Sequence, residues 1–318
     1  MESIRIAKGA KVLVDLAQVK KGENVLVLGD YNTVRVAERI VSEVYQEDAY
    51  PILVLLPPLK VHGEPLPDVI TQMAKLVDVI IAPMTTNLAH TPTRHEAQKA
   101  GVRVLVFPEA TEELLTDPSF DADFWSLRPG VEALANRFTE AKIAKVTSVA
   151  GTDITMSLEG RRGRALHGFA QQGEISAGPG LESSIAPLEG TANGKIVVDV
   201  SIPGLGLVTE PVEILVEKGF ATKIDGGAFA RRFRDLLASK NDPNIYNIGE
   251  LGVGMNPSAT PNGSMLSDEA TRGVIHIALG TSATGGTVQA AGHYDVLMGN
   301  ATLEFDGVAV VKNGQVLV

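Results

Sequence analysis

The first third of the chain alternates apolar runs with segments whose apolar residues recur at helical spacing. The runs Val25–Leu28 and Val77–Ile81 are almost continuously hydrophobic, which is typical of parallel strands covered by helices on both faces. In chain order, the expected elements are Asn24–Leu28, Thr33–Glu47, Pro51–Leu56, Asp68–Leu76, Val77–Ala82, Thr91–Ala100 and Val102–Phe107. This β-α-β-α order predicts an N-terminal doubly wound parallel sheet.

The pattern changes after about Lys145, where short alternating strands separated by Gly, Pro and Asn replace the longer helices. Expected elements around and after this change are helices Thr111–Leu115 and Val131–Ala144, strands Asp153–Leu158 and Lys195–Val200, helix Ala228–Ser239, and a hairpin from Val308–Lys312 through Asn313-Gly314 to Gln315–Val318. The expected fold class is therefore α/β plus α+β. Residues 1–145 form an α/β domain, and residues 146–318 form a mixed, mainly β domain that holds metal.

Composition narrows the possible partners. A chain of 318 residues with 44% hydrophobic and 21% charged residues is ordinary for a soluble protein of two domains. The formal net charge of −10, without a run of lysine or arginine, argues against nucleic acid. No apolar stretch approaches the roughly 18–20 residues of a membrane helix, and the start lacks a signal-peptide pattern, so we expect a cytoplasmic protein.

Near the C-terminus the chain carries the residue types of a metal site. Because there is no cysteine, histidine and carboxylate side chains must supply the ligands. In the triplet from His293 to Asp295, an extended backbone would direct the first and third side chains to one face. In Val274–Gly280 the large residues alternate with small ones and with His276, so its imidazole is expected opposite the apolar face. Such ligands suit zinc, cobalt, manganese or iron better than calcium.

Each of these residues also has a purely structural interpretation. His276 would be a hydrogen-bonded interior histidine, and His293 with Asp295 would form a surface turn. For single residues the structural interpretation is preferred, whereas the group as a whole, together with Glu250, favours a metal site.

The segments Gly249–Asn256, Asp268-Glu269 with Gly273–Gly280, and His293–Asp295 resemble the aminopeptidase T family of thermophilic, leucyl aminopeptidase-like metalloaminopeptidases. Upstream, Gly180–Pro187 is similar to the glutamate-bearing segment of that family. The resemblance implies a metal-ligand set of Glu182, Glu250, His276, His293 and Asp295. It further implies two divalent ions, a metal-activated water that attacks the peptide bond, a peptide or other small-molecule substrate, and a homodimer.

One departure from that family lies at Thr281-Ser282-Ala283, where the family has a tyrosine after its first metal-binding histidine. A second resemblance, to the 2,5-dihydroxypyridine ring-opening dioxygenases, covers His293, Asp295 and the surroundings of His90. Those enzymes use one iron held by two histidines and a carboxylate. They carry histidine at the position of Glu250 and lack equivalents of Glu182 and His276, although a triad of His276, His293 and Asp295 is chemically possible.

Other polar residues carry weaker signals. His90 lies where a strand ends and a helix begins, so it could contact substrate or cap the helix locally. The pair Asp268-Glu269 could supply a general base or begin a helix, and is left unassigned. The basic cluster Arg161–Arg164 could meet a substrate carboxylate, although a solvated hairpin tip is the preferred interpretation.

The sequence thus predicts a metal-dependent aminopeptidase that removes N-terminal residues from peptides. The alternative is a non-haem iron(II) ring-cleaving dioxygenase of the 2,5-dihydroxypyridine type. A third possibility is a metal-binding protein without catalytic activity. The native metal and the number of ions stay open, because zinc, cobalt, manganese and iron all accept these ligands.

Overall fold

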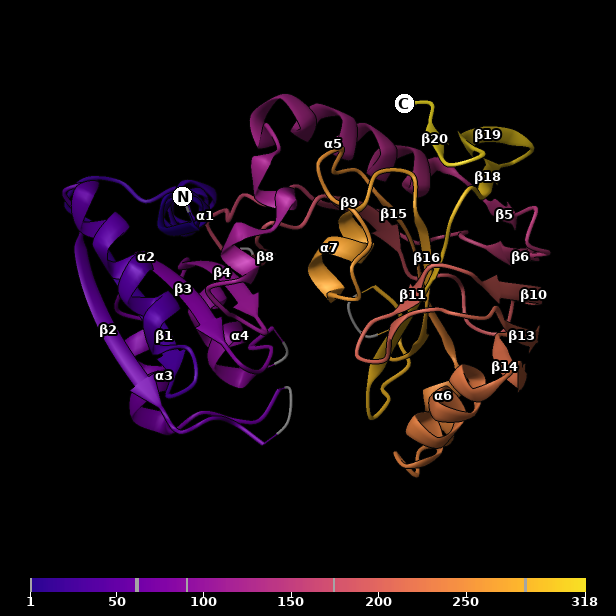
Figure 1. Cartoon of the computed structure of the whole chain (residues 1–318), viewed down its shortest axis with the longest axis horizontal. Coiled ribbons are helices and arrows are strands. Elements are labelled where there is room, and N and C mark those ends of the chain that lie inside the picture. Colours follow the sequence, from indigo (N-terminus) through magenta and orange to yellow (C-terminus); the bar gives the residue numbers. More distant parts are fainter. Residues whose placement is uncertain (1, 61–62, 90, 174, 283–284) are drawn as a thin grey trace. The chain divides into compact units, whose positions relative to one another are not determined.

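The computed structural model of the chain describes all residues except 1, 61–62, 90, 174 and 283–284. Its contacts divide the chain into two compact units (Figure 1). Unit 1 comprises Met1–Asp121 and Gly168–Gly180, and unit 2 comprises Ala122–His167 and Leu181–Val318. This division differs from the predicted boundary after residue 145, because the chain enters unit 2 earlier and returns once to unit 1.

Unit 1 is built on a parallel sheet with the strand order β2-β1-β3-β4-β8. Its elements are α1 (Glu2–Leu16), β1 (Asn24–Asp30), α2 (Val34–Gln46), β2 (Tyr50–Leu56), α3 (Asp68–Ala74), β3 (Val79–Met84), α4 (Pro92–Lys99), β4 (Arg103–Pro108), the 3₁₀ turns η1 (Leu114–Thr116) and η2 (Pro118–Asp121), and β8 (Ile175–Ala177). The predicted parallel sheet is confirmed.

Two elements of unit 1 differ from the prediction. Helix α1 was not predicted, although Ile6, Ala10 and Leu13 follow helical spacing and are buried in the structure. The predicted helix Thr111–Leu115 is wrong, because only the short turn η1 forms there. Strands β3 and β4 are buried along their whole length, which explains their continuous apolar sequence.

The carboxyl ends of β1 and β3 are tied together by one buried side chain. The carboxylate of Asp30 accepts hydrogen bonds from the backbone N–H groups of Thr85 (2.7 Å) and Asn32 (3.0 Å) and from the Thr85 hydroxyl (2.9 Å). Asp30 is fully buried. A charged acceptor with several donors offsets the cost of burying it.

Unit 2 is mainly β. Its elements are α5 (Phe124–Glu140), β5 (Ile143–Thr147), β6 (Asp153–Ser157), β7 (Arg164–Leu166), β9 (Glu182–Ile185), β10 (Asn193–Val198), β11 (Ser201–Ile202), β12 (Gly206–Leu207), β13 (Val212–Glu217), β14 (Phe220–Asp225), α6 (Ala228–Ala238), η3 (Pro243–Tyr246), β15 (Ile248–Gly254), α7 (Met265–Ala270), β16 (Ile275–Gly280), β17 (His293–Met298), β18 (Thr302–Phe305), β19 (Val308–Lys312) and β20 (Gln315–Val316).

Two antiparallel sheets organise unit 2. The larger has the order β14-β13-β10-β6-β5-β18-β19-β20, and the smaller has the order β17-β16-β15-β9-β7. The predicted helix Val131–Ala144 is too long at its end, because α5 ends at Glu140 and β5 begins at Ile143. Helix α5 packs on β9 and β7, so it covers one face of the smaller sheet.

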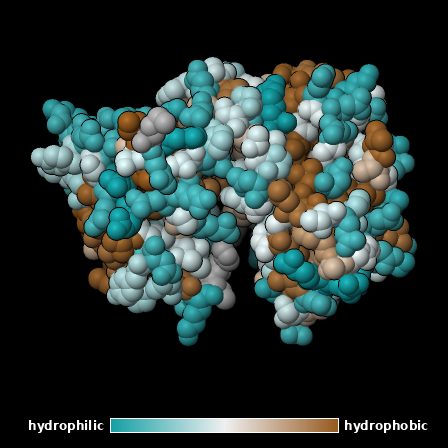
Figure 2. Space-filling model, viewed as in Figure 1, coloured by the Kyte–Doolittle hydropathy of each residue, from teal (hydrophilic) through white to brown (hydrophobic). Residues whose placement is uncertain are grey.

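The surface is mixed in character. In Figure 2 most of the visible face is hydrophilic, and hydrophobic residues form smaller groups between the polar ones. Among the residues that the structure describes, no helix has both the length and the apolar character needed to cross a bilayer.

We predict that Asp30→Ala destabilises unit 1, because it removes a buried charged acceptor that binds backbone donors at the ends of β1 and β3. The free energy of unfolding should fall by about 2 kcal/mol or more. Urea unfolding followed by circular dichroism measures this change. Asp15→Ala is the control, since Asp15 is exposed and only pairs with Lys11 on the surface, and its effect should stay within about 0.5 kcal/mol. Equal effects of the two substitutions would contradict the role given to Asp30.

Candidate metal centre

The register of the smaller sheet directs the predicted ligands to one face. Asp295 of β17 pairs with Ala278 of β16, and Ala278 pairs with Glu250 of β15. Paired residues of adjacent strands point to the same side of a sheet. His293 lies two residues before Asp295 and shares its face.

The neighbouring row extends the same face. His276 pairs with Gly252, which pairs with Ser184 of β9, and Glu182 lies two residues before Ser184. Ser183, which points the other way, donates a hydrogen bond to the carbonyl of Val131 in α5 (2.7 Å). The candidate ligands therefore all lie on the face opposite α5.

The side chains converge as well as the backbone. The Nε2 atom of His276 lies 3.5 Å from a carboxylate oxygen of Glu182 and 3.9 Å from one of Glu250. One ligand atom from each of these three residues lies within 4.8 Å of the others. On β17, Nε2 of His293 lies 3.5 Å from a carboxylate oxygen of Asp295. The structure thus places all five predicted residues on one sheet face, three of them in one close group and two in a pair on β17. Their role as ligands stays a prediction.

A glycine makes room for the central histidine. A Cβ atom at Gly252 would lie 2.0 Å from Nε2 of His276 and 2.4 Å from its Cε1 atom. The imidazole therefore lies directly across the backbone of β15. No larger residue fits at position 252 without moving His276.

His293 is oriented by a backbone carbonyl. Its Nδ1 atom lies 2.9 Å from the carbonyl oxygen of Thr281, so Nδ1 carries the proton and donates it. Nε2, on the side of Asp295, is then the nitrogen that could bind a metal. A fixed tautomer of this kind is typical of metal-binding histidines.

A fourth acidic side chain at the site was left unassigned in the sequence. Glu269, near the end of α7, lies against Asp295 and within coulombic reach of Glu182 and Glu250. Its neighbour Asp268 has a different role, since its carboxylate accepts hydrogen bonds from the backbone N–H groups of Asn262 and Gly263. Helix α7 starts at Met265, so Asp268 lies in its first turn and Glu269 follows it.

Arg164 is a second residue whose position the sequence did not indicate. It is the first residue of β7 and pairs with Ser184, so it shares the face of the candidate ligands. Its guanidinium lies 3.7 Å from the carboxylate of Glu250, and its side chain is 35% exposed against 13% for Glu250. Arg164 therefore lies at the solvent edge of the cluster. The interpretation as a solvated hairpin tip is wrong for this residue.

Burial and neighbouring charges give the two glutamates of the cluster different pKa values. Burial raises the pKa of Glu182 to about 7; His276 opposes this shift, while Glu250 and Asp295 add to it. Burial also acts to raise the pKa of Glu250, but the two histidines and Arg164 outweigh it and hold the pKa at about 2. Glu250 is thus the more firmly ionised of the two.

The other titratable groups respond to the same concentration of carboxylates. Burial acts to lower the pKa of His276, but Glu182, Glu250 and Asp295 raise it to about 9. The pKa of His293 is also raised, since Asp295 and Glu250 outweigh burial. Burial, followed by the charges of Asp295 and Glu182, raises the pKa of Glu269 well above its usual value. Without a metal, the site therefore holds protons between its acidic groups.

The residues fit a divalent cation. Among the described residues, three buried atoms at the site lack a hydrogen-bond partner, namely Nδ1 of His276, Oδ1 of Asp295 and Oε1 of Glu269. Buried polar atoms in this state are rare and indicate an ion or water. Imidazole nitrogens with carboxylate oxygens suit zinc, iron, manganese or cobalt. His90, the expected substrate contact, lies outside the described residues.

The two sequence comparisons point to one enzyme family. The family model of 2,5-dihydroxypyridine 5,6-dioxygenase matches residues 7–318. The 2,5-dihydroxypyridine 5,6-dioxygenase of Pseudomonas putida is 28% identical over 247 residues, which cover 73% of this chain and 69% of that protein.

Two solved structures share the fold. The structure of 2,5-dihydroxypyridine dioxygenase from Pseudomonas putida aligns with a TM-score of 0.85 at 24% identity, covering 98% of this chain and 97% of that one. Wild-type AmpT from Thermus thermophilus aligns with a TM-score of 0.69 at 16% identity over the full length of both chains. The resemblance to aminopeptidase T is therefore one of fold. The prediction that the chain is a hydrolase is not supported, and the alternative prediction, the dioxygenase, takes its place.

We predict that Gly252→Ala weakens metal binding without unfolding the chain. The new Cβ atom displaces His276, and misplacing one ligand should raise the dissociation constant for zinc at least about tenfold. Competition with a chromophoric chelator measures the constant. Gly130→Ala in α5 is the matched control, since a Cβ there meets only the methyl carbon of Met255 at 3.6 Å. Wild-type zinc affinity in Gly252→Ala would show that His276 is not a ligand.

Proposed function

We propose, from the premise that this chain belongs to the 2,5-dihydroxypyridine 5,6-dioxygenase family, that it is a metal-dependent ring-cleaving dioxygenase acting on a hydroxylated nitrogen heterocycle. The observation that carries the proposal is the match to the family model from residue 7 to residue 318, which includes the whole candidate metal centre. The metal centre supports it, because two histidines and several carboxylates converge on one face of a sheet.

The ligand set that best suits this chemistry is His276, His293 and Asp295. Two histidines and one carboxylate leave open positions on the metal and are typical of non-haem iron(II) oxygenases. Iron(II) bound there would supply the redox chemistry by which dioxygen reacts with an aromatic ring. Glu182 and Glu250 are close enough to His276 to complete or adjust this set.

The choice of His276 follows from a difference within the family resemblance. The resembling dioxygenases carry histidine where this chain has Glu250. In this chain the second imidazole instead comes from β16, the strand adjacent to β15, and it lies across Gly252. We infer that His276 on β16 supplies the imidazole that the resembling dioxygenases carry at the position of Glu250 on β15.

Arg164 is suited to bind the substrate. Its guanidinium lies at the solvent edge of the cluster, where its described ion pair, at 3.7 Å from Glu250, is longer than a hydrogen bond. Its donors are therefore available to an oxygen atom of the incoming ring. A ring hydroxyl that receives such a hydrogen bond is held more strongly as its anion.

The test of the function is oxygen uptake. Protein loaded anaerobically with iron(II) is expected to consume dioxygen when 2,5-dihydroxypyridine is added, with equimolar loss of the ring absorbance. Asp295→Asn should reduce kcat/KM at least about 100-fold, because it removes a predicted charged ligand. Asp306→Asn is the control. Asp306 follows the last residue of β18, and its carboxylate accepts hydrogen bonds from the backbone N–H groups of Lys142 and Ile143.

The same assay can also contradict the proposed dioxygenase function. Iron-loaded protein that consumes no dioxygen with dihydroxylated pyridines, but releases amino acids from peptides, would overturn the proposal. Zinc-loaded protein should be inactive in oxygen uptake, since zinc has no redox chemistry.

For Arg164 we predict a defect in substrate binding alone. Arg164→Gln should raise KM about tenfold or more, which corresponds to the loss of a hydrogen bond to a charged group. The KM of Arg164→Lys should lie between those of Arg164→Gln and the wild type, because lysine keeps the charge but not the forked geometry of the guanidinium. Steady-state oxygen uptake at varied ring concentration separates KM from kcat. A fall in kcat with unchanged KM, or a loss of iron affinity, would contradict a substrate-binding role.

A further inference from the structure

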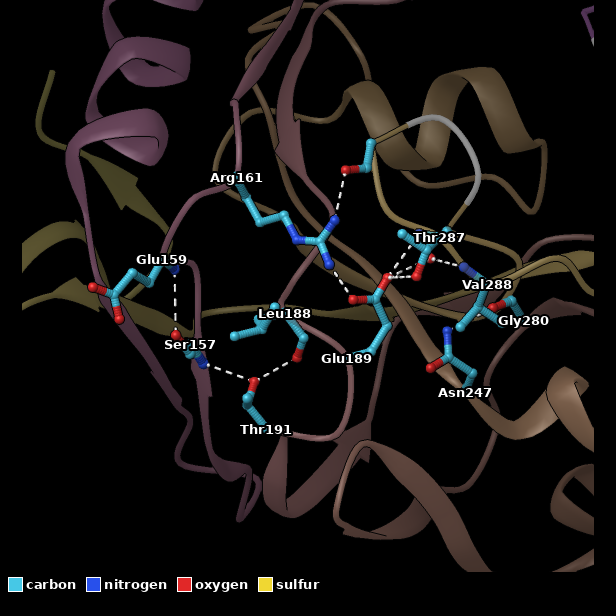
Figure 3. A network of polar contacts seen from close by, with 12 residues as sticks. Ser157, Glu159, Arg161, Leu188, Glu189, Thr191, Asn247, Gly280, Thr287 and Val288 are labelled. Carbon is cyan, nitrogen blue, oxygen red and sulfur yellow. Dashed lines mark hydrogen bonds and ion pairs between the residues drawn. The ribbon is translucent and has the colours of Figure 1, made fainter.

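The connection between β16 and β17 joins the two strands that carry His276 and His293. It comprises residues 281–292, of which all but 283 and 284 are described. Side chains from other parts of unit 2 hold this connection along its length (Figure 3). Its conformation matters for the site because the carbonyl of Thr281 accepts the hydrogen bond from His293.

The middle of the connection is held by Glu189. This residue follows β9, the strand that begins with Glu182, and its carboxylate points at the connection (Figure 3). It accepts hydrogen bonds from the backbone N–H of Thr287 (2.7 Å), from the Thr287 hydroxyl (3.0 Å) and from the Ser282 hydroxyl (3.4 Å). One carboxylate therefore binds both sides of the connection.

Arg161 completes the arrangement. Its guanidinium forms an ion pair with Glu189, as Figure 3 shows. It also donates a hydrogen bond to the carbonyl of Gly285 (3.1 Å). The side chains of Arg161 and Glu189 are only 13% and 22% exposed, so solvent screens the pair less than a surface ion pair. The interpretation of the basic cluster as a solvated tip is wrong for Arg161 as well.

Within the connection the contacts lead from Glu189 to His293. The Ser282 hydroxyl accepts a hydrogen bond from the N–H of Val288 (3.1 Å), and the Thr281 hydroxyl donates one to the carbonyl of Val288 (3.1 Å). The backbone N–H of Ser282 also donates to that carbonyl (2.9 Å). Thr281, whose carbonyl orients His293, is thus fixed through the residues that Glu189 binds.

The two ends of the connection have other anchors. The amide of Asn247 donates to the carbonyl of Gly280 (2.9 Å), and the amide of Asn244 donates to the carbonyl of Gln289 (2.9 Å). The carboxylate of Asp242 accepts from the N–H of Ala291 (2.7 Å). Loss of Glu189 would therefore release the middle of the connection while both ends stay attached.

We propose that Arg161 and Glu189 are positioning residues for the metal centre, which hold the β16–β17 connection so that the Thr281 carbonyl fixes the tautomer and direction of His293. The inference rests on the proposed role of His293 as a metal ligand. It also explains the departure from the aminopeptidase pattern. The hydroxyls of Thr281 and Ser282, at the place of the family's tyrosine, form hydrogen bonds with Val288 inside the connection.

The test compares Glu189→Gln with the wild type by two measurements that do not depend on turnover. Hydrogen exchange followed by mass spectrometry should be faster in residues 285–292 of the variant, because Thr287 loses its charged acceptor. The dissociation constant for zinc, measured by chelator competition, should rise about tenfold, the usual effect of removing a partner that orients a ligand. Exchange elsewhere in unit 2 should be unchanged.

Glu159→Gln is the matched control. It removes the same charge two residues from Arg161, but the Glu159 side chain is exposed and points away from the network in Figure 3. We expect wild-type exchange and wild-type zinc affinity for this variant. Thr287→Val is a second, milder variant that loses one hydroxyl and keeps the backbone donor, and its effects should be in the same direction but smaller.

Three outcomes would overturn the proposal. Glu189→Gln could leave both exchange and affinity unchanged, or it could speed exchange in the connection without weakening zinc binding. It could also speed exchange throughout the chain together with a fall in the melting temperature, which would show a general role in stability. A wild-type protein that binds no zinc would refute the metal centre instead, and the exchange measurement would still show whether Glu189 holds the connection.

Discussion

The repulsion between buried carboxylates governs the architecture of unit 2. Glu182, Glu250, Glu269 and Asp295 lie on or against one face of a five-stranded sheet, where two like charges about 4 Å apart repel by about 4 kcal/mol at a protein-like dielectric. Two imidazoles and Arg164 offset part of this charge. The raised pKa values of Glu182 and His276 show that protons offset more of it. A divalent cation would replace those protons and remove the repulsion directly.

Such a concentration of charge persists only if the backbone prevents the side chains from separating. The sheet does this, since adjacent strands fix the spacing of Asp295, Glu250 and His276 through their register. Gly252 also helps to keep the side chains together, because it lets the imidazole of His276 lie across the strand. The connection between β16 and β17 adds the last element, since it fixes the direction of His293.

Much of this arrangement could be predicted from the sequence, and the failures have physical causes. The alternation in Val274–Gly280 and the spacing of His293 and Asp295 predicted which side chains share a face, because period two follows from local backbone geometry. Arg164 and Glu269 could not be placed in this way. Their positions depend on which strand pairs with β9 and on how α7 packs, and both depend on contacts between distant segments. For the same reason Arg161 could not be distinguished from an exposed arginine.

The choice between hydrolase and dioxygenase shows why a set of ligands does not determine a reaction. Three of the five residues that resemble aminopeptidase ligands have ligand atoms within 4.8 Å of one another and the other two form a pair on β17, yet the family match assigns the chain to a dioxygenase family. The chain shares its fold with a solved structure from each group, so the fold alone cannot separate the two reactions. The reaction then depends on the residues around the candidate metal centre. In this chain, the hydroxyls of Thr281 and Ser282 bind within the connection and to Glu189, while the backbone carbonyl of Thr281 orients His293. An imidazole fixed in this way suits any metal-dependent reaction that the surrounding residues select.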